Sequence, residues 1–165
     1  MISAIVAVDE NYGIGYKGDL LCNIKEDLKH FKELTTNGVV VMGKKTWDSL
    51  PKKPLPNRFN IVITNQERHF EEMTAFIPFE EVVSRMVHAI PEEKWFIIGG
   101  GAIYKELLPY CEHIHLTKIH KSFENADTHF PNIDEMSNWE LESASDIKEE
   151  NGIKYQFCIY KNLNK

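Results

Sequence analysis

Residues 95–104 read Trp95-Phe-Ile-Ile-Gly-Gly-Gly-Ala-Ile-Tyr104, an apolar run that meets three glycines and then a helical pattern. A short run without polar residues is typical of a strand that is covered on both faces of a parallel sheet. Three glycines let the backbone approach a ligand closely, and the helix that follows offers free N–H groups to a phosphate. This segment predicts a phosphate cradle at Gly99–Gly101, with a simple tight turn as the alternative.

Two more strands end in a similar way. Val39–Met42 is continuously apolar and runs into Gly43-Lys-Lys45, and Ile61–Ile63 runs into Thr64-Asn65. In open α/β sheets, ligands bind outside the carboxyl ends of the strands. Solvated lysines and turn initiation are the alternatives for these two strand ends. Taken together, the three strand ends predict an elongated anionic ligand such as a dinucleotide.

The same patterns predict eight strands and four helices. The expected strands are Ile2–Val8, Val39–Met42, Asn60–Ile63, Ala75–Ile77, Trp95–Ile98, His113–Ile119, Trp139–Ala144 and Lys154–Tyr160. The expected helices are Ile24–Thr35, Lys44–Leu50, Phe79–His88 and Ala102–Leu108. We therefore predict one α/β domain over residues 1–165: a doubly wound, mostly parallel eight-stranded sheet with a C-terminal antiparallel hairpin and about four flanking helices.

Asp27 occupies an unusual position on the first of these helices. Ile24, Leu28, Phe31 and Leu34 fall at helical spacing and form an apolar stripe, and Asp27 lies inside it. The residues expected on the opposite, solvent-facing side are Lys25, Glu26, Lys29, His30, Lys32 and Glu33. A buried carboxylate needs a compensating partner, and such a group is a candidate for a site with a tuned pKa. The alternative is a residue of the first helical turn that complements the helix dipole, with Asn23 and Glu26 forming a capping box.

Composition limits the possible functions. The chain is 42% hydrophobic and 27% charged, values typical of a soluble globular protein. Its formal net charge of −6 argues against non-specific nucleic-acid binding. No apolar run is long enough to span a membrane, and no basic segment precedes the first expected strand as in a signal peptide. Three cysteines without paired spacing suit a reducing cytoplasm.

Four other patterns are weaker. The loop Asp9–Asn23 contains three glycines and leads into the Asp27 helix, so we interpret it as a lid over a site. Cys22 precedes a helix, but no histidine is placed to activate it as a nucleophile.

His113 and His115 share one strand face without further ligands for zinc, so we predict no metal site. Glu149-Glu150 is interpreted as part of a solvated turn ahead of Asn151-Gly152.

Over nearly its whole length the chain resembles the dihydrofolate reductase family. The matching motifs are Ile5-Val-Ala7, Gly13-Ile-Gly15, Asp27-Leu-x-x-Phe31, Met42-Gly-x-x-Thr46-Trp-x-Ser49-Leu50, Pro54-Leu-Pro-x-Arg58, Ile98-Gly-Gly-Gly101 with Tyr104, Leu116-Thr117, and Asp127-Thr-His-Phe-Pro131. The resemblance implies hydride transfer from NADPH to C6 of 7,8-dihydrofolate, with protonation at N5. It also implies a monomer in the cytoplasm that binds dihydrofolate and antifolates and has no nucleic-acid or membrane partner.

The resemblance also implies roles for individual residues. Asp27 would hydrogen-bond the pterin, Thr117 would orient that carboxyl group, and Arg58 would pair with the glutamate carboxylate. Leu20 would line the nicotinamide and is grouped with the catalytic residues. The remaining substrate residues would be Ile5, Leu28, Phe31, Leu50, Leu55 and Ile98. The cofactor residues would be Ala7, Ile14, Gly15, Leu20, Gly43, Lys44, Lys45, Thr46, Ser49, Ile63, Thr64, Asn65, Ile98, Gly99, Gly100, Gly101, Ala102, Ile103 and Tyr104.

The chain departs from the family pattern at three places. Leu20-Leu-Cys22 stands where the family usually has Leu-Pro-Trp, which removes an indole N–H donor near the substrate. We expect reduced trimethoprim affinity from this change. Ala102 stands where an arginine is common, which leaves Lys44, Thr64 and Asn65 for the 2′-phosphate of NADPH. Ala126 replaces a usual glycine, which would alter the motion of the neighbouring loop.

Two rival functions use the same residues differently. A riboflavin-pathway pyrimidine reductase would share the glycine strand ends and NADPH, but it would not need Asp27, Phe31 and Arg58 together. A non-catalytic nucleotide- or pterin-binding module would tolerate the loss of the tryptophan at position 22, but it would not need Asp27 and Thr117. Loss of NADPH absorbance on adding dihydrofolate separates the three possibilities.

Overall fold

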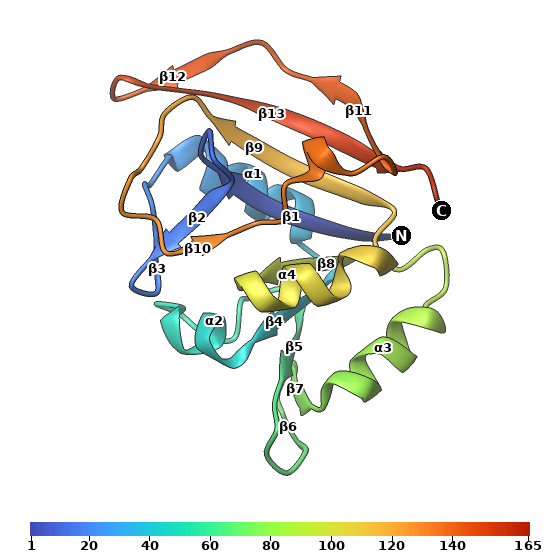
Figure 1. Ribbon diagram of the computed structural model, residues 1–165. Helices are drawn as coiled ribbons and strands as arrows, with labels where there is room; N and C mark the ends of the chain where they lie inside the picture. Colours follow the sequence, from blue (N-terminus) through green and yellow to red (C-terminus); the bar gives the residue numbers. More distant parts are fainter.

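The computed structural model describes residues 1–165 as a central twisted sheet with helices on both faces (Figure 1). In chain order its elements are β1 (Ile2–Val8), β2 (Gly13–Tyr16), β3 (Asp19–Leu20), α1 (Lys25–Thr35), β4 (Val39–Gly43), α2 (Lys44–Ser49), β5 (Phe59–Ile63), β6 (His69–Glu71), β7 (Thr74–Ile77), α3 (Phe79–Val87), β8 (Trp95–Gly99), α4 (Gly101–Leu107), the 3₁₀ helix η1 (Leu108–Tyr110), β9 (His113–Ile119), β10 (Thr128–His129), the 3₁₀ helix η2 (Ile133–Glu135), β11 (Trp139–Ala144), β12 (Lys148–Glu150) and β13 (Ile153–Asn162).

The main sheet has ten strands in the order β11-β13-β9-β1-β8-β4-β5-β7-β6, with β12 paired to β13. The central strands β9, β1, β8, β4, β5 and β7 are parallel. The strands β11, β12 and β13 add an antiparallel end to the sheet, and β6 adds an antiparallel edge on the other side. The predicted α/β fold, with its mostly parallel sheet, C-terminal antiparallel strands and four helices, is confirmed.

Alternate residues of the central strands face two different cores. One core gathers Val41, Ile61, Ile77 and Ile97 with side chains of α3 and α4. The other gathers Val40, Met42, Val62 and Phe96 with Trp47 of α2 and with Phe31 and Leu34 of α1. Because strand side chains alternate between faces, continuously apolar strands are buried on both sides. Because β4, β5 and β8 run parallel, their carboxyl ends lie at the same edge of the sheet.

The sequence patterns missed the five short strands β2, β3, β6, β10 and β12. β6 and β12 extend the main sheet, and β2 and β3 join β10 in a separate three-stranded sheet. These strands have two to four residues each, and β3 and β6 are wholly exposed. They lack the alternation that a half-buried strand shows. The segment Asp9–Asn23 is therefore not simply a loop, because it contains the β2–β3 hairpin.

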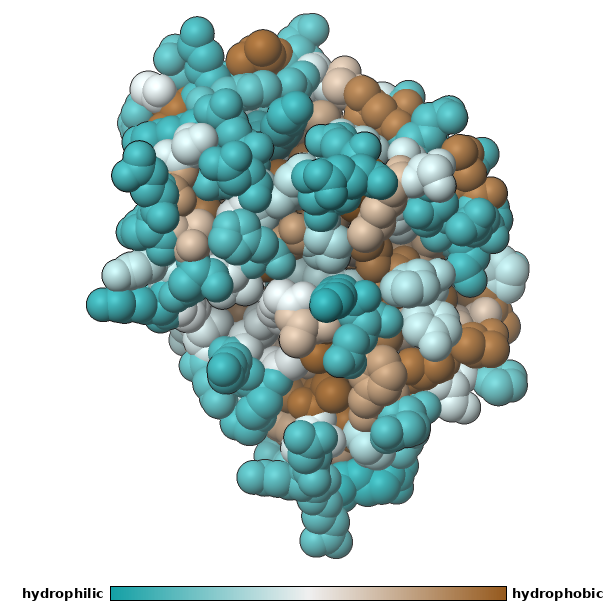
Figure 2. Space-filling model, in the orientation of Figure 1, coloured by the Kyte–Doolittle hydropathy of each residue, from teal (hydrophilic) through white to brown (hydrophobic).

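The surface differs across the face drawn in Figure 2. The left side, over β2, β3 and α2, is mostly hydrophilic, and hydrophobic patches come through on the right and lower centre, in the region of α3 and α4. No helix is long and apolar enough to cross a membrane.

Candidate active site

Asp27 and Thr117 meet at the centre of the site. Asp27 lies in the first turn of α1, and Thr117 lies on β9, where it is buried. The Thr117 hydroxyl donates a hydrogen bond of 2.5 Å to Asp27 Oδ1. Burial raises the pKa of the Asp27 carboxyl group, and the Thr117 hydrogen bond and the charge of His30 partly oppose that rise. The proton therefore stays on Asp27 at a higher pH than it would on an ordinary aspartate.

The packing of α1 corrects three expectations. Leu28 belongs to the predicted apolar stripe, yet its side chain is 49% exposed. His30 was expected to point to solvent, but its ring stacks on Phe157 with centroids 4.1 Å apart. The capping box of Asn23 and Glu26 is wrong, because the cap residue is Ile24 and no cap side chain bonds the helix. The free N–H groups of the first turn are bonded instead by a residue far away in the sequence.

That residue is Glu150, which the sequence analysis interpreted as part of a solvated turn. Its carboxylate accepts hydrogen bonds from the backbone N–H of Lys25 at 2.7 Å and of Glu26 at 3.3 Å. Glu150 ends the strand β12, so the turn interpretation is wrong for this residue. Its role has no local sequence signal, because the helix that it caps starts 125 residues earlier.

An apolar wall lies beside Asp27. Ile5 is buried, and the half-buried residues Phe31, Leu50, Leu55 and Ile98 pack on the same core. This brings together four of the predicted substrate residues from α1, the end of α2, the following loop and β8, with Ile5 from β1. Leu28, which is half exposed, is not part of this core. The wall is suited to a flat, largely apolar ligand.

Arg58 is a buried cation without an acidic partner. Its side chain is 4% exposed, and it donates to the Pro56 carbonyl at 2.8 Å and to Thr35 Oγ1 at 3.0 Å. The guanidinium carbon lies 5.9 Å from the centre of the Phe31 ring, and burial lowers the pKa of Arg58. A buried charge is costly unless it is paired. The two neutral acceptors leave further N–H groups of the fork for an anion that would arrive with a ligand.

The glycine turns after β4 and β8 lie against each other. A methyl group built on Gly43 would lie 3.0 Å from Ile103 Cγ1 and 3.9 Å from the Gly100 nitrogen. One built on Gly100 would lie 3.5 Å from Thr46 Oγ1. Gly99 has φ 127°, which favours glycine, and the Gly99–Gly100 peptide bond is cis. The two predicted strand ends therefore form one narrow backbone cradle.

Tyr104 connects this cradle to the Asp27 region. It is buried, and its hydroxyl donates to the Ile5 carbonyl at 2.7 Å. A side chain on Gly99 would lie 3.3 Å from its ring. Burial, and then the nearby charge of Asp27, raise the pKa of Tyr104. Ala7 lies opposite Thr117 in the ladder between β1 and β9. These contacts link the Asp27 region to the glycines through Thr117, β1 and Tyr104.

The remaining cofactor candidates are spread around the cradle. Lys44 is paired with Asp48 at 2.6 Å, Lys45 is exposed, and Ser49 donates to the Thr46 carbonyl at 2.7 Å. Thr64 is buried and accepts from the Gln66 N–H at 3.0 Å, whereas Asn65 and Ala102 are exposed. Ile14, Ile63 and Ile103 are half-buried against the core.

The β2–β3 hairpin is tied down at several points. Leu20 at its end is 61% exposed. The Gly15 carbonyl accepts from Asp127 N–H at 2.9 Å, and Asp127 Oδ2 accepts from Lys17 N–H at 3.0 Å. The buried Asp9 accepts from the N–H groups of Asn11, Gly13 and Phe123 at 2.7–2.9 Å. The sequence analysis missed Asp9, although its position just after β1 is one that strand-end reasoning singles out.

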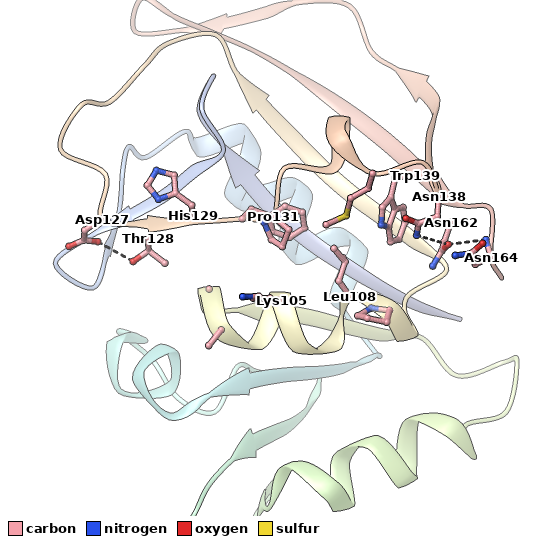
Figure 3. Close-up of a pocket in the computed structure, with 15 residues that line it drawn as sticks. Lys105, Leu108, Asp127, Thr128, His129, Pro131, Asn138, Trp139, Asn162 and Asn164 are labelled. Carbon is pink, nitrogen blue, oxygen red and sulfur yellow. Dashed lines mark hydrogen bonds between the residues drawn. The ribbon is translucent and has the colours of Figure 1, made fainter.

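A separate cavity of about 790 Å³ runs along α4 (Figure 3). Gly101, Ala102 and Thr128 at one end belong to the surroundings of the cradle, while Trp139 and Asn162 line the far end. Lys105 supplies a polar group between the two ends, and His129 lies at the Thr128 end. The sequence analysis did not predict this cavity, because its lining comes from four distant segments.

Comparisons with known proteins agree with this geometry. Residues 1–162 match the family model described as dihydrofolate reductase. The dihydrofolate reductase of Bacillus subtilis (strain 168) is 40% identical over 167 residues, which cover 99% of this chain and 96% of that protein. That of Aedes albopictus is 36% identical, covering 99% and 98%. A solved dihydrofolate reductase from Enterococcus faecalis, complexed with NADP(H) and RAB-propyl, has a TM-score of 0.85 and 33% identity, covering 98% of this chain and 96% of that one.

Proposed function

The chain belongs to the dihydrofolate reductase family, and on that premise we propose that it reduces 7,8-dihydrofolate to tetrahydrofolate with NADPH, through hydride transfer to C6 and protonation at N5. The observation that carries the proposal is the half-buried Asp27 carboxyl group, held by Thr117 beside an apolar wall and a glycine cradle. This arrangement suits an acid–base group next to a flat heterocycle.

The substrate would lie between Asp27 and Arg58. Asp27 binds the polar edge of the pterin, and Thr117 fixes the orientation of the carboxyl group. Ile5 and Ile98 offer backbone carbonyls, while Leu28, Phe31, Leu50 and Leu55 pack against the rings. Arg58 pairs with the glutamate carboxylate of the tail, since its fork still has free donors. In this proposal the exposed side chain of Leu28 becomes covered when substrate binds.

The cofactor would cross the two glycine turns. The cradle admits a backbone-bound ligand because Gly43 and Gly100 leave space that side chains would fill. The phosphates are bound by Gly43, Gly99, Gly100, Gly101 and Ile103. The adenosine end is surrounded by Lys44, Lys45, Ser49, Ile63, Thr64, Asn65 and Ala102. The nicotinamide ring is lined by Ala7, Ile14, Gly15, Leu20, Thr46, Ile98 and Tyr104. When bound, the nicotinamide supplies the hydride.

The chain itself controls the position of the proton. The raised pKa keeps a proton available on Asp27 at a higher pH than on an ordinary aspartate, and this availability falls as the pH rises through that pKa. Leu20, on the hairpin tied by Asp9 and Asp127, closes over the reacting rings and limits access of water. Asp27 either donates to N5 directly or passes the proton through one water molecule.

We also propose that residues 1–165 act as one monomeric domain in the cytoplasm, without nucleic-acid or membrane partners. Three free cysteines suit a reducing compartment. The net charge of −6 disfavours binding to nucleic-acid phosphates.

An absorbance assay tests the function. We expect NADPH absorbance at 340 nm to fall when dihydrofolate is added to the purified protein, and tetrahydrofolate to accumulate in equal amount. Consumption of a riboflavin-pathway pyrimidine substrate instead would favour the same-fold rival. NADPH binding without turnover of either substrate would favour a non-catalytic binding module.

Ala102 bears on cofactor preference. Ala102 lies exposed in the first turn of α4, so an arginine there would add a cation near the proposed phosphates. We expect Ala102→Arg to lower KM for NADPH about three- to tenfold and to leave KM for NADH nearly unchanged. Ala102→Gln is the matched neutral control. If Ala102→Arg lowered KM equally for NADPH and NADH, the arginine would act at the diphosphate that both cofactors share. That result would refute a role at the 2′-phosphate.

Cys22 bears on antifolate binding, and we propose that its presence reduces trimethoprim affinity. Its half-buried side chain packs beside Ile24 and Ile119, and burial, then the charge of Asp27, raise the pKa of its thiol. We expect Cys22→Trp, which adds an indole N–H donor, to lower the trimethoprim inhibition constant several-fold. Cys22→Phe provides an aromatic ring without that donor. Identical inhibition constants for wild type and Cys22→Trp would rule the idea out.

A further inference from the structure

The catalytic helix is held at its start by the C-terminal hairpin. α1 has no side-chain cap of its own, and Glu150 bonds the N–H groups of Lys25 and Glu26. Glu150 is placed by the tight turn between β12 and β13, in which Asn151 and Gly152 both have positive φ and Glu150 pairs with Ile153. An Asn-Gly turn of this type gives a hairpin of fixed register. The cap is therefore presented by an ordered element.

Three more contacts join the same helix to the same hairpin. Tyr155 donates from its hydroxyl to Glu26 Oε2 at 2.6 Å, and Lys148 Nζ lies 3.6 Å from Glu26 Oε1. One turn further along, His30 stacks on Phe157. Each contact joins a residue of α1 to β12 or β13. The orientation of α1, and with it the direction of Asp27, therefore depends on this hairpin.

Glu150 also changes the electrostatics of the helix terminus. The N-terminus of a helix carries a partial positive charge that favours the ionised form of a carboxyl group in the first turn. Asp27 is the third residue of α1 and lies in that turn. The negative charge of Glu150, set on the N–H groups of the two preceding residues, offsets part of the positive end. Removing this charge should favour the ionised form of Asp27.

We propose that Glu150 is a positioning residue for the reaction: it fixes the first turn of α1, and thereby sets both the placement of the Asp27 carboxyl group and the strength with which the helix terminus attracts its negative charge. The role of Asp27 as the acid–base group rests on the proposed function. Glu150 itself is bonded to backbone groups of α1 and has no place in the proposed binding surfaces.

Other charged groups near Asp27 remain unchanged in the test. Thr117 of β9 is its direct partner, and His30 and Glu26 lie on its own helix. Cys22 precedes the helix, while Tyr104 of α4 and Tyr155 of β13 lie close enough for the Asp27 charge to raise the pKa of each. A substitution at position 150 leaves all six side chains in the protein, so any shift in Asp27 titration reports on Glu150.

The experiment compares wild type with Glu150→Gln, Glu150→Ala and Glu149→Gln. Glutamine keeps a side-chain oxygen that can accept hydrogen bonds from the backbone N–H groups of α1, but it removes the negative charge. Alanine removes both the oxygen and the charge. Glu149 is an exposed acid on the same strand, paired in register with Lys154, and it makes no bond to α1. The pH profile of kcat is measured with dihydrofolate and NADPH. The Asp27 carboxyl is titrated separately by ¹³C NMR of the free enzyme.

We expect Glu150→Gln to lower the Asp27 titration midpoint by roughly 0.3–0.5 pH units, the size of a helix-terminus charge effect. The profile of kcat should shift equally, and KM should stay within about twofold. Glu150→Ala should also raise KM for dihydrofolate about three- to tenfold, and Glu149→Gln should match wild type.

Two results would overturn the inference. One is an Asp27 midpoint that is unchanged in Glu150→Gln, and the other is an equal shift in Glu150→Gln and Glu149→Gln. A thermal melt of each variant separates a loss of folded protein from a change in titration. The NMR titration does not require turnover. If the wild-type protein had no activity, the proposed function would be refuted. The NMR titration would still show whether Glu150 affects the titration of Asp27.

Discussion

Asp27→Asn is expected to lower kcat at pH 7 by about 10²- to 10⁴-fold, the usual contribution of a general acid–base group. Asparagine can still accept the hydrogen bond that Thr117 donates, so the fold and NADPH binding should be retained. It cannot hold the proton that the raised pKa of Asp27 keeps available. Steady-state kinetics with a parallel NADPH-binding titration would measure both effects.

The pH dependence makes this prediction sharper. In wild type, the rate should fall as the pH rises through the raised pKa of Asp27, because the protonated carboxyl group is then lost. In Asp27→Asn this dependence should disappear. The rate should instead recover in part at low pH, where dihydrofolate arrives already protonated. Glu33→Gln, an exposed acid on the same helix, is the control. Near wild-type activity of Asp27→Asn at pH 7 would refute the assignment.

Arg58→Gln should raise KM for dihydrofolate about 10- to 100-fold with a much smaller change in kcat. Hydrogen bonds to charged groups stabilise by about 1.5–3 kcal/mol, and Arg58 has no acidic partner in the protein, so a ligand carboxylate is its expected partner. Arg58 would bind the glutamate tail of dihydrofolate before hydride transfer takes place. We therefore expect the substitution to change KM more than kcat.

A shortened substrate separates recognition from folding. Arg58 also bonds Thr35 and Pro56, so its loss could disturb α1. With dihydropteroate, which lacks the glutamate, wild type and Arg58→Gln should have similar KM values if only the carboxylate contact is lost. Arg58→Lys tests whether a point charge replaces the planar fork. An equal loss with both substrates would show that Arg58 acts through the structure and not through the glutamate.

Much of the fold was accessible from local patterns. The apolar runs at Val39–Met42 and Trp95–Ile98 mark strands that are covered on both faces, and the structure places both in the centre of the sheet. The glycines after them were correctly placed at strand-to-helix turns. The short strands β2, β3, β6, β10 and β12 were not predicted because two to four residues are too few to show a period.

The site was accessible only in part. Periodicity singled out Asp27, because a carboxylate inside an apolar stripe conflicts with the pattern around it. It did not predict that Leu28 would be exposed or that His30 would stack on Phe157. Both depend on how α1 packs against the sheet, where its contacts with β13 join residues that are far apart in the sequence.

By itself, the order of residues established an α/β chain with glycine-ended strands and one conspicuous carboxylate, since propensity and periodicity act over a few neighbouring positions. Three-dimensional packing alone decided which groups face one another. Thr117 reaches Asp27 across 90 residues, Glu150 reaches α1 across 125, and Asp9 holds Phe123 across 114. Such contacts depend on strand order and register, which bring distant segments within hydrogen-bond distance only when the whole sheet has formed.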